Sequence, residues 1–247
     1  MTFLHGGQLE KIKQQFPNHT QTWVDLSTGV SPFSYPVGLK DNEAAQSLPQ
    51  QHEALKNAAA KYYGSHSLVI TPGSMWAIQN LPLIRRLLHA DDNRHVLIPK
   101  QGFNEHKKAW QTWGFDIELY DDEPSKIQLT SAQACIVINP NNPTGKLLKV
   151  DQLISMHKTL SEHNAYLLVD EAFLDLSPEL SLASYADKQN LIVLKSFGKF
   201  FGLPGLRVGA LIAQKAILDE TNKLLNEWSI TSTAQTTAIQ AWLDTHW

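Results

Sequence analysis

The stretch Ser196-Phe-Gly-Lys-Phe-Phe-Gly-Leu-Pro-Gly-Leu-Arg-Val-Gly209 places one lysine and one arginine in a glycine-rich loop, directly after the apolar run Leu191-Ile-Val-Leu194. Lys199 and Arg207 are eight residues apart, so a turn can direct both side chains toward one ligand. A lysine amine reacts with carbonyl groups, and a guanidinium binds phosphate. The pair therefore indicates a site for an anionic cofactor that carries a carbonyl group, a description that fits pyridoxal phosphate. Two solvated charges in a loop are the competing interpretation.

An earlier apolar run in the chain is followed by a carboxylate. Asp170 comes directly after Tyr166-Leu-Leu-Val169 and opens Asp170-Glu-Ala-Phe173. In α/β sheets, ligands bind at the carboxyl ends of the strands, where a carboxylate can hold the proton on a pyridine nitrogen. A nucleotide hydrolase with a magnesium-binding strand is the alternative. That alternative requires a G-x-x-x-x-G-K-[ST] loop, and Gly145-Lys146 lacks both the earlier glycine and the following hydroxyl.

Two more turns follow apolar runs. Asn142 lies in the Asn- and Pro-rich turn after the run 135–138, where its amide can donate a hydrogen bond to a ring oxygen. The run 68–71 leads through Pro72-Gly73-Ser74 into an apolar helical pattern that begins at Met75. A helix start offers unpaired backbone N–H groups and the positive end of a dipole, so it can bind a phosphate. An ordinary turn and an ordinary capped helix are the simpler readings.

Taken in order, these motifs resemble those of the fold-type I pyridoxal phosphate enzymes of the class I/II aminotransferase group. Within the group the sequence is most similar to the threonine-phosphate decarboxylases of cobalamin biosynthesis, which are related to the histidinol-phosphate aminotransferases. The resemblance covers nearly all 247 residues. The narrower match rests on His5-Gly-Gly7, Asp25-Leu-Ser-Thr-Gly29, Gly102-Phe-Asn-Glu-His106 and Ser196-Phe-Gly-Lys-Phe-Phe-Gly202.

The resemblance implies an α/β fold of the PLP-dependent transferase type: a large domain with a mostly parallel sheet and helices on both faces. It implies an N-terminal arm over 1–45, a PLP-binding large domain over 46–227, and the start of a truncated small domain over 228–247. Most of the C-terminal small domain of the relatives is then missing. We expect apolar surface to be uncovered around Trp228 and Trp242 in such a chain. A homodimer is the family expectation.

The resemblance also implies roles for individual residues. Lys199 would form the Schiff base with the cofactor and later return a proton to the substrate's α-carbon. A cationic, partly dry site lowers the pKa of a lysine in the direction that this chemistry needs. The residues expected to bind the cofactor are Gly73, Ser74, Met75, Phe103, Asn142, Asp170, Phe173, Ser196 and Arg207. Those expected to bind the substrate are His5, Gly6 and Gly29.

Four positions depart from the pattern of the wider group. Phe173 stands where aminotransferases usually have a tyrosine that donates to the ring hydroxyl. Gly198 replaces a common second serine of the phosphate site, and Leu48 replaces a tyrosine that reaches the phosphate of the neighbouring subunit. Gly29 occupies the place of an asparagine near the substrate carboxylate. These changes leave cofactor binding plausible and shift the substrate away from a typical transamination site.

The resemblance implies decarboxylation of L-threonine O-3-phosphate to (R)-1-aminopropan-2-yl phosphate. The small-molecule partner is then a phosphorylated amino acid, and no metal is implied. An aminotransferase of the histidinol-phosphate type is the enzymatic alternative. A truncated fragment that binds pyridoxal phosphate without catalysis is the non-enzymatic one. The bond that breaks is the one held perpendicular to the cofactor ring, so a few substrate contacts decide between the two enzymes.

Composition agrees with a cytoplasmic enzyme. With 43% apolar residues, 247 residues can bury one large core. A net charge of −3 without a basic stripe argues against binding to nucleic acid or to a membrane surface. Cys135 is the only cysteine, so no disulfide forms within the chain and a reducing compartment is expected. No signal peptide and no apolar run of membrane-spanning length is present.

Hydrophobic periodicity predicts an alternating α/β chain. Helical patterns cover 7–16, 50–63, 74–89, 103–113, 150–162 and 214–227. Strand patterns cover 68–71, 95–99, 115–119, 134–138, 165–169, 191–195 and 208–212.

Overall fold

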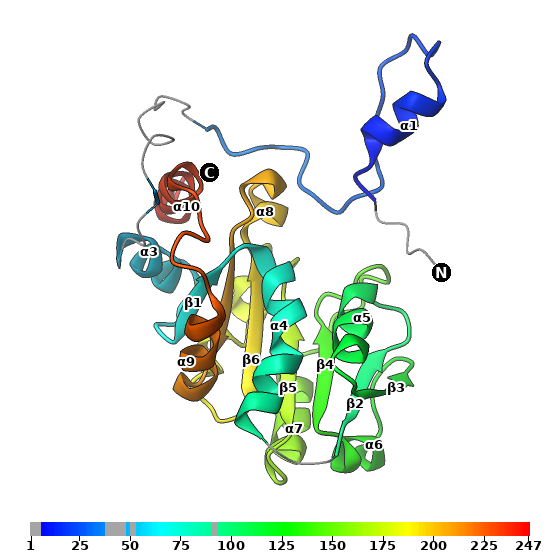
Figure 1. Cartoon of the computed structure of the whole chain (residues 1–247), viewed down its shortest axis with the longest axis vertical. Coiled ribbons are helices and arrows are strands. Elements are labelled where there is room, and N and C mark those ends of the chain that lie inside the picture. Colours follow the sequence, from blue (N-terminus) through cyan, green and yellow to red (C-terminus); the bar gives the residue numbers. More distant parts are fainter. Residues whose placement is uncertain (1–5, 38–47, 50–52, 90–92) are drawn as a thin grey trace.

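The computed structural model describes residues 6–37, 48–49, 53–89 and 93–247 of the chain. Its centre is a seven-stranded sheet between two layers of helices (Figure 1). The strands are β1 (Leu68–Thr71), β2 (His95–Pro99), β3 (Asp116–Tyr120), β4 (Ala134–Ile138), β5 (Tyr166–Asp170), β6 (Leu191–Ser196) and β7 (Gly209–Ala213). Each lies within one residue of a predicted strand.

The strands follow the order β1-β7-β6-β5-β4-β2-β3. The pairs from β6 to β3 are parallel, and only β7 runs antiparallel to its neighbours β1 and β6. The predicted, mostly parallel sheet is confirmed. Because parallel strands end at one edge, the ends of β4, β5 and β6 bring the predicted site residues to the same place.

Helices cover both faces of the sheet, as predicted. They are α1 (Leu9–Gln15), α3 (Glu53–Tyr63), α4 (Gly73–Leu88), α5 (Asn104–Thr112), α6 (Lys126–Ser131), α7 (Val150–Ser161), α8 (Phe197–Phe200), α9 (Lys215–Leu224) and α10 (Ser232–Leu243). The buried apolar side chains of α4, α5 and α9 pack into one apolar cluster against the sheet. Those of α3, α6, α7 and α10 pack into the other, on the opposite face.

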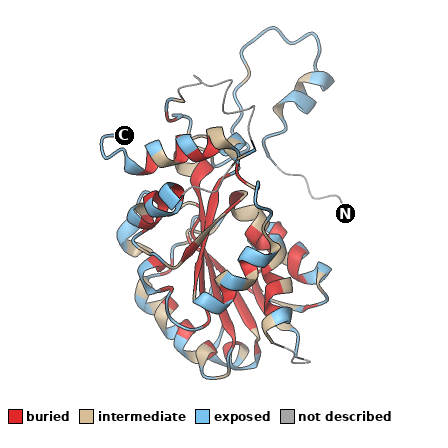
Figure 2. Ribbon diagram, turned by 60° about the vertical axis from the view of Figure 1, so that its left-hand side comes forward, coloured by how far each residue is buried: buried red, intermediate tan, exposed pale blue. Residues whose placement is uncertain are grey.

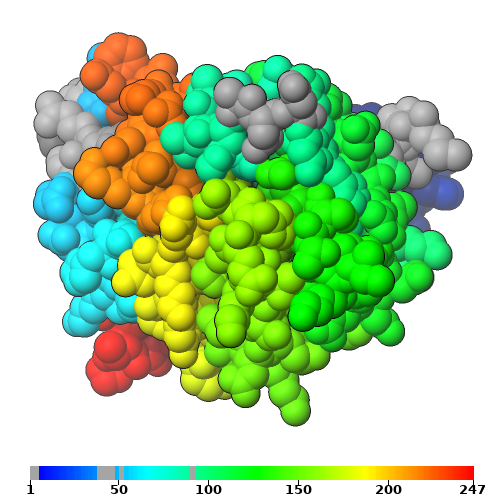
Figure 3. All heavy atoms as spheres, turned by 90° about the horizontal axis from the view of Figure 1, so that it is seen from below, coloured from blue at the N-terminus to red at the C-terminus, as the bar shows by residue number. Residues whose placement is uncertain are grey.

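The strands are buried on both faces, and this explains their apolar composition. Every residue of β4, β5, β6 and β7 is buried, whereas the helices are buried on one side only (Figure 2). Continuous apolar runs are typical of parallel strands covered by helices on both sides. The end of the sheet away from α8 is closed over by packed atoms from most of the described chain (Figure 3).

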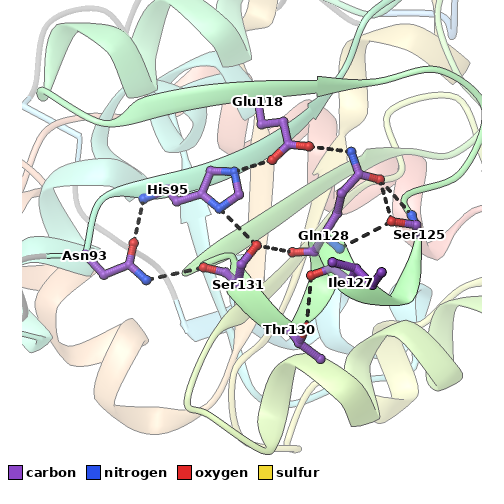
Figure 4. Close-up of polar contacts among 8 residues, drawn as sticks. All are labelled: Asn93, His95, Glu118, Ser125, Ile127, Gln128, Thr130 and Ser131. Atoms are coloured by element: carbon purple, nitrogen blue, oxygen red, sulfur yellow. Dashed lines mark hydrogen bonds and ion pairs between the residues drawn. The ribbon is translucent and has the colours of Figure 1, made fainter.

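The sequence patterns missed two short helices, α6 and α8. Six residues are too few to show a repeating apolar pattern of helical period. A capping box stabilises α6: Ser125 Oγ accepts from the backbone N–H of Gln128, whose side chain accepts from the backbone N–H of Ser125. Gln128 Nε2 also donates to Glu118 at 2.6 Å, and Glu118 pairs with His95 at 2.7 Å (Figure 4). Polar contacts between β2, β3 and α6 therefore fix this helix, and hydropathy does not reveal them.

The C-terminal helix α10 packs onto α3, and this corrects one expectation. Trp242 is only 4% exposed, and its ring contacts those of Tyr63 and Phe197 at centroid distances of 5.7 and 5.4 Å. The expected uncovered surface around Trp242 is wrong, because α3 and α8 cover the indole. Trp228 is 51% exposed, as expected for that position.

In the N-terminal part of the described chain, residues 29–35 contact the rest of the fold, with Gly29 against Phe173. Helix α1 has no buried residue and projects from the body (Figure 1). Residues 31–35 run along the loop that carries Lys199: the N–H of Ser31 donates to the carbonyl of Lys199 at 2.9 Å, and that of Tyr35 to Phe201 at 3.0 Å. This segment therefore lies next to Lys199.

None of the helices in the described ranges is long and apolar enough to cross a membrane.

Candidate functional site

Ten residues that the sequence predicts for the site line one cavity at the carboxyl edge of the sheet. The cavity has a volume of about 110 Å³. The ten are Gly73, Ser74, Met75, Phe103, Asn142, Asp170, Phe173, Ser196, Lys199 and Arg207. They come from the start of α4, the start of α5, the ends of β5 and β6, and the loops beside them. The fold thus gathers residues that are up to 134 positions apart, from 73 to 207.

One end of the cavity is built for an anion. Gly73 begins the 16-residue helix α4, whose first N–H groups have no partner within the helix. A Cβ at Gly73 would lie 2.8 Å from Nη2 of Arg207, so the absence of a side chain lets the guanidinium approach the helix start. Gly73 has a φ of 73° and Arg207 a φ of 54°, and both are therefore in the left-handed region. The positive end of α4 and a guanidinium together form a phosphate seat.

The lining of the cavity also includes a buried carboxylate. Asp170 ends β5 and is 3% exposed. Its Oδ2 lies 2.9 Å from Nε2 of His106, which is fully buried on α5, and its Oδ1 accepts from the backbone N–H of Ala172 at 3.1 Å. Both carboxylate oxygens are thus held in place. A carboxylate fixed in this way suits a ligand with a basic ring nitrogen.

Lys199 also lines the cavity, and its amine is influenced by the charges of both Arg207 and Asp170. Burial lowers the pKa of Lys199, the positive charge of Arg207 lowers it further, and the negative charge of Asp170 opposes both effects. A lower pKa leaves more of the amine neutral at a given pH, and the neutral amine is the form that attacks a carbonyl group. The geometry therefore supplies a reactive lysine beside an anion seat.

Three more side chains close the cavity. Phe103 precedes α5, and its ring lies 6.4 Å from the imidazole of His106 at an angle of 83°. The Nζ of Lys199 lies 5.6 Å from the centroid of the Phe173 ring. Asn142 is an exposed part of the lining. Aromatic faces at these positions suit a flat ligand ring.

Of the three residues predicted to bind the substrate, the two that the structure describes do not line the cavity formed by the ten residues above. Gly29 lines a second cavity of about 620 Å³ that adjoins the first, and the two share Ala172, Phe173 and Lys199. Gly6 lies against Ser27 instead, since a Cβ on it would be 1.9 Å from the carbonyl oxygen of Ser27, and it lines neither cavity. His5 lies outside the described residues.

Two polar residues of the site were not predicted. His106 lies three residues after Phe103 on the first turn of α5, so helical spacing could have placed it near the site, but its contact with Asp170 spans 64 positions. Asp175 lines the larger cavity, and only its position two residues after Phe173 could have suggested this.

The sequence of the chain is similar to those of a known enzyme family. The sequence pattern named aminotransferase class I and II matches residues 23–246. The chain is 34% identical over 226 residues to the threonine-phosphate decarboxylase of Pseudomonas aeruginosa, covering 92% of this chain and 66% of that protein. It is 32% identical over 132 residues to the histidinol-phosphate aminotransferase of Buchnera aphidicola, covering 53% of this chain and 35% of that protein.

A solved structure shares the fold. The aminotransferase AspB from Helicobacter pylori superposes with a TM-score of 0.76 and 22% sequence identity, covering 99% of this chain and 74% of AspB. This likeness concerns the fold alone. The chain spans about two thirds of the length of the decarboxylase that it matches.

Proposed function

Because the chain belongs to the class I and II aminotransferase family, we propose that it is part of a pyridoxal 5′-phosphate-dependent enzyme that decarboxylates L-threonine O-3-phosphate. The carrying observation is that ten predicted residues line one cavity in a chain that is similar to a threonine-phosphate decarboxylase over nearly its whole length. The product would be (R)-1-aminopropan-2-yl phosphate. A cytoplasmic homodimer is part of the proposal.

The residues of the cavity fit pyridoxal 5′-phosphate, which is the cofactor of this family. The cofactor combines a phosphate, a basic ring nitrogen and an aldehyde. Arg207 and the start of α4 suit the phosphate, since Gly73 leaves room for the guanidinium there. Asp170 suits the ring nitrogen, because His106 and the N–H of Ala172 hold both of its oxygens. Lys199, with its lowered pKa, suits the aldehyde.

When bound, the cofactor supplies an electron sink for the pair of electrons that the substrate's α-carbon retains after a bond to it breaks. Asp170 keeps a proton on the ring nitrogen, and this keeps the sink effective. Lys199 would hold the cofactor through its aldehyde and would move a proton to or from the substrate's α-carbon. Phe103 and Phe173 line the cavity and would offer apolar faces to the cofactor ring, and the contacts that orient the substrate would then decide which bond breaks.

The substrate assignment rests on similarity and on the absence of a side chain at position 29. Gly29 has no side-chain amide to hold a substrate carboxylate, and its neighbour Phe173 presents an apolar face to the same cavity. A carboxylate beside apolar walls is poorly solvated, and loss of carbon dioxide relieves that cost. These features favour decarboxylation over transfer of the amino group.

An absorbance spectrum of the chain with added pyridoxal 5′-phosphate tests the proposal. We expect a band in the near-visible range that the variant Lys199→Ala lacks, and release of carbon dioxide from O-phospho-L-threonine without a 2-oxo acid. A requirement for a 2-oxo acid would instead identify an aminotransferase. A Lys199-dependent band without turnover of either substrate would identify a binding fragment.

A further inference from the structure

The larger cavity beside Lys199 has a largely apolar lining with several aromatic rings and one acid. Its aromatic lining residues are Phe33, Phe173, Phe200 and Trp247. Asp175 is the only acidic side chain among the described residues of the lining, and Lys199 is the only basic one. The two cavities share Lys199 and Phe173. A molecule that approaches Lys199 through the larger cavity therefore enters a space that Asp175 also lines. The role of Asp175 is not explained by the cofactor site.

The charge around Asp175 is not balanced. Lys195 forms a buried ion pair with Glu171 at 2.7 Å, and the two side chains are 3% and 0% exposed. Glu171 also accepts from the backbone N–H of Leu182 at 2.8 Å and from Ser181 Oγ at 2.5 Å. The charge of Lys195 is therefore matched by Glu171. A second carboxylate at position 175 leaves this cluster with one uncompensated negative charge.

The partners of Asp175 do not remove that charge. Tyr62 and Tyr63 of α3, Glu171 after β5 and Lys195 of β6 are the titratable groups that act on it, and Lys199 shares its cavity. The hydroxyl of Tyr62 is near enough to act on the carboxylate, but the buried Oδ2 atom has no hydrogen-bond partner among the described residues. A half-buried carboxylate with one buried, unsatisfied oxygen lacks stabilisation as an anion. It gains most from a cation that also donates hydrogen bonds.

The protonation behaviour of Asp175 agrees with this reasoning. Burial raises the pKa of Asp175 to about 6, the charge of Lys195 opposes the rise, and that of Glu171 adds to it. The carboxyl group is then mostly ionised at pH 7.5, yet it can accept a proton at modest cost. Such a group suits both the binding of a cation and the removal of a proton from it.

The cavity already holds an ammonium group against an aromatic ring. The Nζ of Lys199 lies 5.6 Å from the centroid of the Phe173 ring, a distance at which a cation is attracted by the ring face. An ammonium group that enters the larger cavity meets the same aromatic lining, which includes Phe33, Phe200 and Trp247. An amino acid brings one, and its nitrogen must lose a proton before it can attack a carbonyl carbon.

We propose that Asp175 binds the α-ammonium group of the incoming amino acid in the larger cavity and accepts one of its protons. In this step one N–H bond breaks, an O–H bond forms on Asp175, and the electron pair stays on nitrogen. A cation and an anion thereby become a neutral amine and a neutral acid, and no redox partner is needed. The inference rests on the proposed function only in that the substrate is an amino acid.

Binding of propan-1-amine, compared with propan-1-ol, tests the inference without assuming a substrate. Titration calorimetry would be run on the chain alone and on the chain loaded with pyridoxal 5′-phosphate and reduced with borohydride. We expect Asp175→Asn to bind the amine about 10- to 100-fold more weakly, since a charge-assisted hydrogen bond is lost, and to bind the alcohol as the unmodified chain does. Asp116→Asn, at an exposed acid on β3, should change neither.

A second readout separates this role from a structural one. Affinity of the unmodified chain for the amine should fall as the pH drops through about 6, because Asp175 then loses its charge. Asp175→Asn should lack this dependence, and Asp175→Glu should restore part of it. Thermal unfolding checks that each variant is folded.

The outcomes decide the inference independently of the proposed function. Equal affinity of Asp175→Asn and the unmodified chain for the amine, or equal loss of amine and alcohol, would overturn it, as would the absence of amine binding in both forms of the chain. A chain that fails to take up the cofactor, but in which Asp175→Asn loses the amine selectively, would contradict the proposed function and support the inference.

Discussion

Nε2 of His106 lies 2.9 Å from Oδ2 of Asp170, and both side chains are buried at the carboxyl edge of the sheet. The contact joins the first turn of α5 to the end of β5. His106 thus prevents the carboxylate from rotating away from the cavity, while the N–H of Ala172 holds the other oxygen. The second imidazole nitrogen, Nδ1, is buried without a hydrogen-bond partner among the described residues. The histidine is therefore bonded through its ring to Asp170 alone.

Replacing His106 should impair turnover more than cofactor binding. His106→Phe keeps an aromatic ring but removes the partner of Asp170, and loss of a hydrogen bond to a charged group corresponds to about a 10- to 100-fold lower kcat. His106→Gln offers an amide N–H and should recover part of the rate. Steady-state kinetics with the cofactor band as a loading control measures both. An unchanged kcat for His106→Phe would show that Asp170 is held well enough without it.

Removing the carboxylate itself should have a larger effect. Asp170→Asn cannot keep a proton on a ring nitrogen, so we expect the cofactor band to persist while turnover falls by at least as much as in His106→Phe. The carboxylate is buried, and its amide replacement is of the same size. Turnover of Asp170→Asn near that of the unmodified chain would remove Asp170 from its proposed role.

The phosphate seat predicts a loss of cofactor affinity. Arg207→Ala removes the guanidinium beside the start of α4, and a charge-assisted contact of this kind corresponds to about a 10- to 100-fold rise in Kd for pyridoxal 5′-phosphate. Arg207→Lys keeps the charge but not the planar fork, so its Kd should lie between the two. Equilibrium titration by absorbance gives the values. Pyridoxal, which lacks the phosphate, serves as control and should bind both variants and the unmodified chain alike.

Much of the fold follows from the sequence because its strands are buried on both faces. Continuous apolar runs such as Leu191-Ile-Val-Leu194 in β6 leave little ambiguity about where the strands lie. Helix α6 escaped prediction because it is held by Ser125, Gln128 and Glu118 through polar contacts. The burial of Trp242 depends on the packing of α10 against α3, and no local pattern encodes a contact between segments 180 positions apart.

The candidate site was predictable where a motif ends a strand. Asp170 and Ser196 are the last residues of β5 and β6, so the topology alone brings them to one edge. His106 and Asp175 were not found, because what matters in each is a partner far along the chain. Their chemistry appears only when burial and pairing are known, as with the ion pair that leaves Asp175 unmatched.

Gly29 and Phe173 should be coupled energetically. A Cβ at position 29 would lie 2.7 Å from Cε1 of Phe173, so Gly29→Ala forces the ring to move. We expect a loss of at most about 1 kcal/mol in the free energy of unfolding, less than in an overpacked core, because Gly29 is exposed. Combining it with Phe173→Leu should cost less than the sum of the two single changes, because the smaller side chain gives way. Urea unfolding of all four proteins gives the coupling, and strictly additive losses would contradict the contact.

Asp175→Asn should stabilise the fold at neutral pH. Burial raises the pKa of Asp175 to about 6 in the folded chain, whereas an unfolded aspartate titrates at about 3.9. Between these values the folded chain binds more protons than the unfolded chain, so this group makes stability fall as the pH rises from about 4 to about 6.

The penalty is then constant above pH 6, and a shift of about two pKa units sets an upper limit of about 3 kcal/mol. Asparagine does not ionise, so the variant should match the unmodified chain near pH 4, exceed it increasingly up to about pH 6, and keep a constant advantage above that pH. Urea unfolding at four pH values between 4 and 7.5 measures the difference, with Asp116→Asn as a control at an exposed acid. A variant that is less stable at pH 7 than at pH 4, relative to the unmodified chain, would mean that Lys195 stabilises the ionised carboxylate more than burial penalises it.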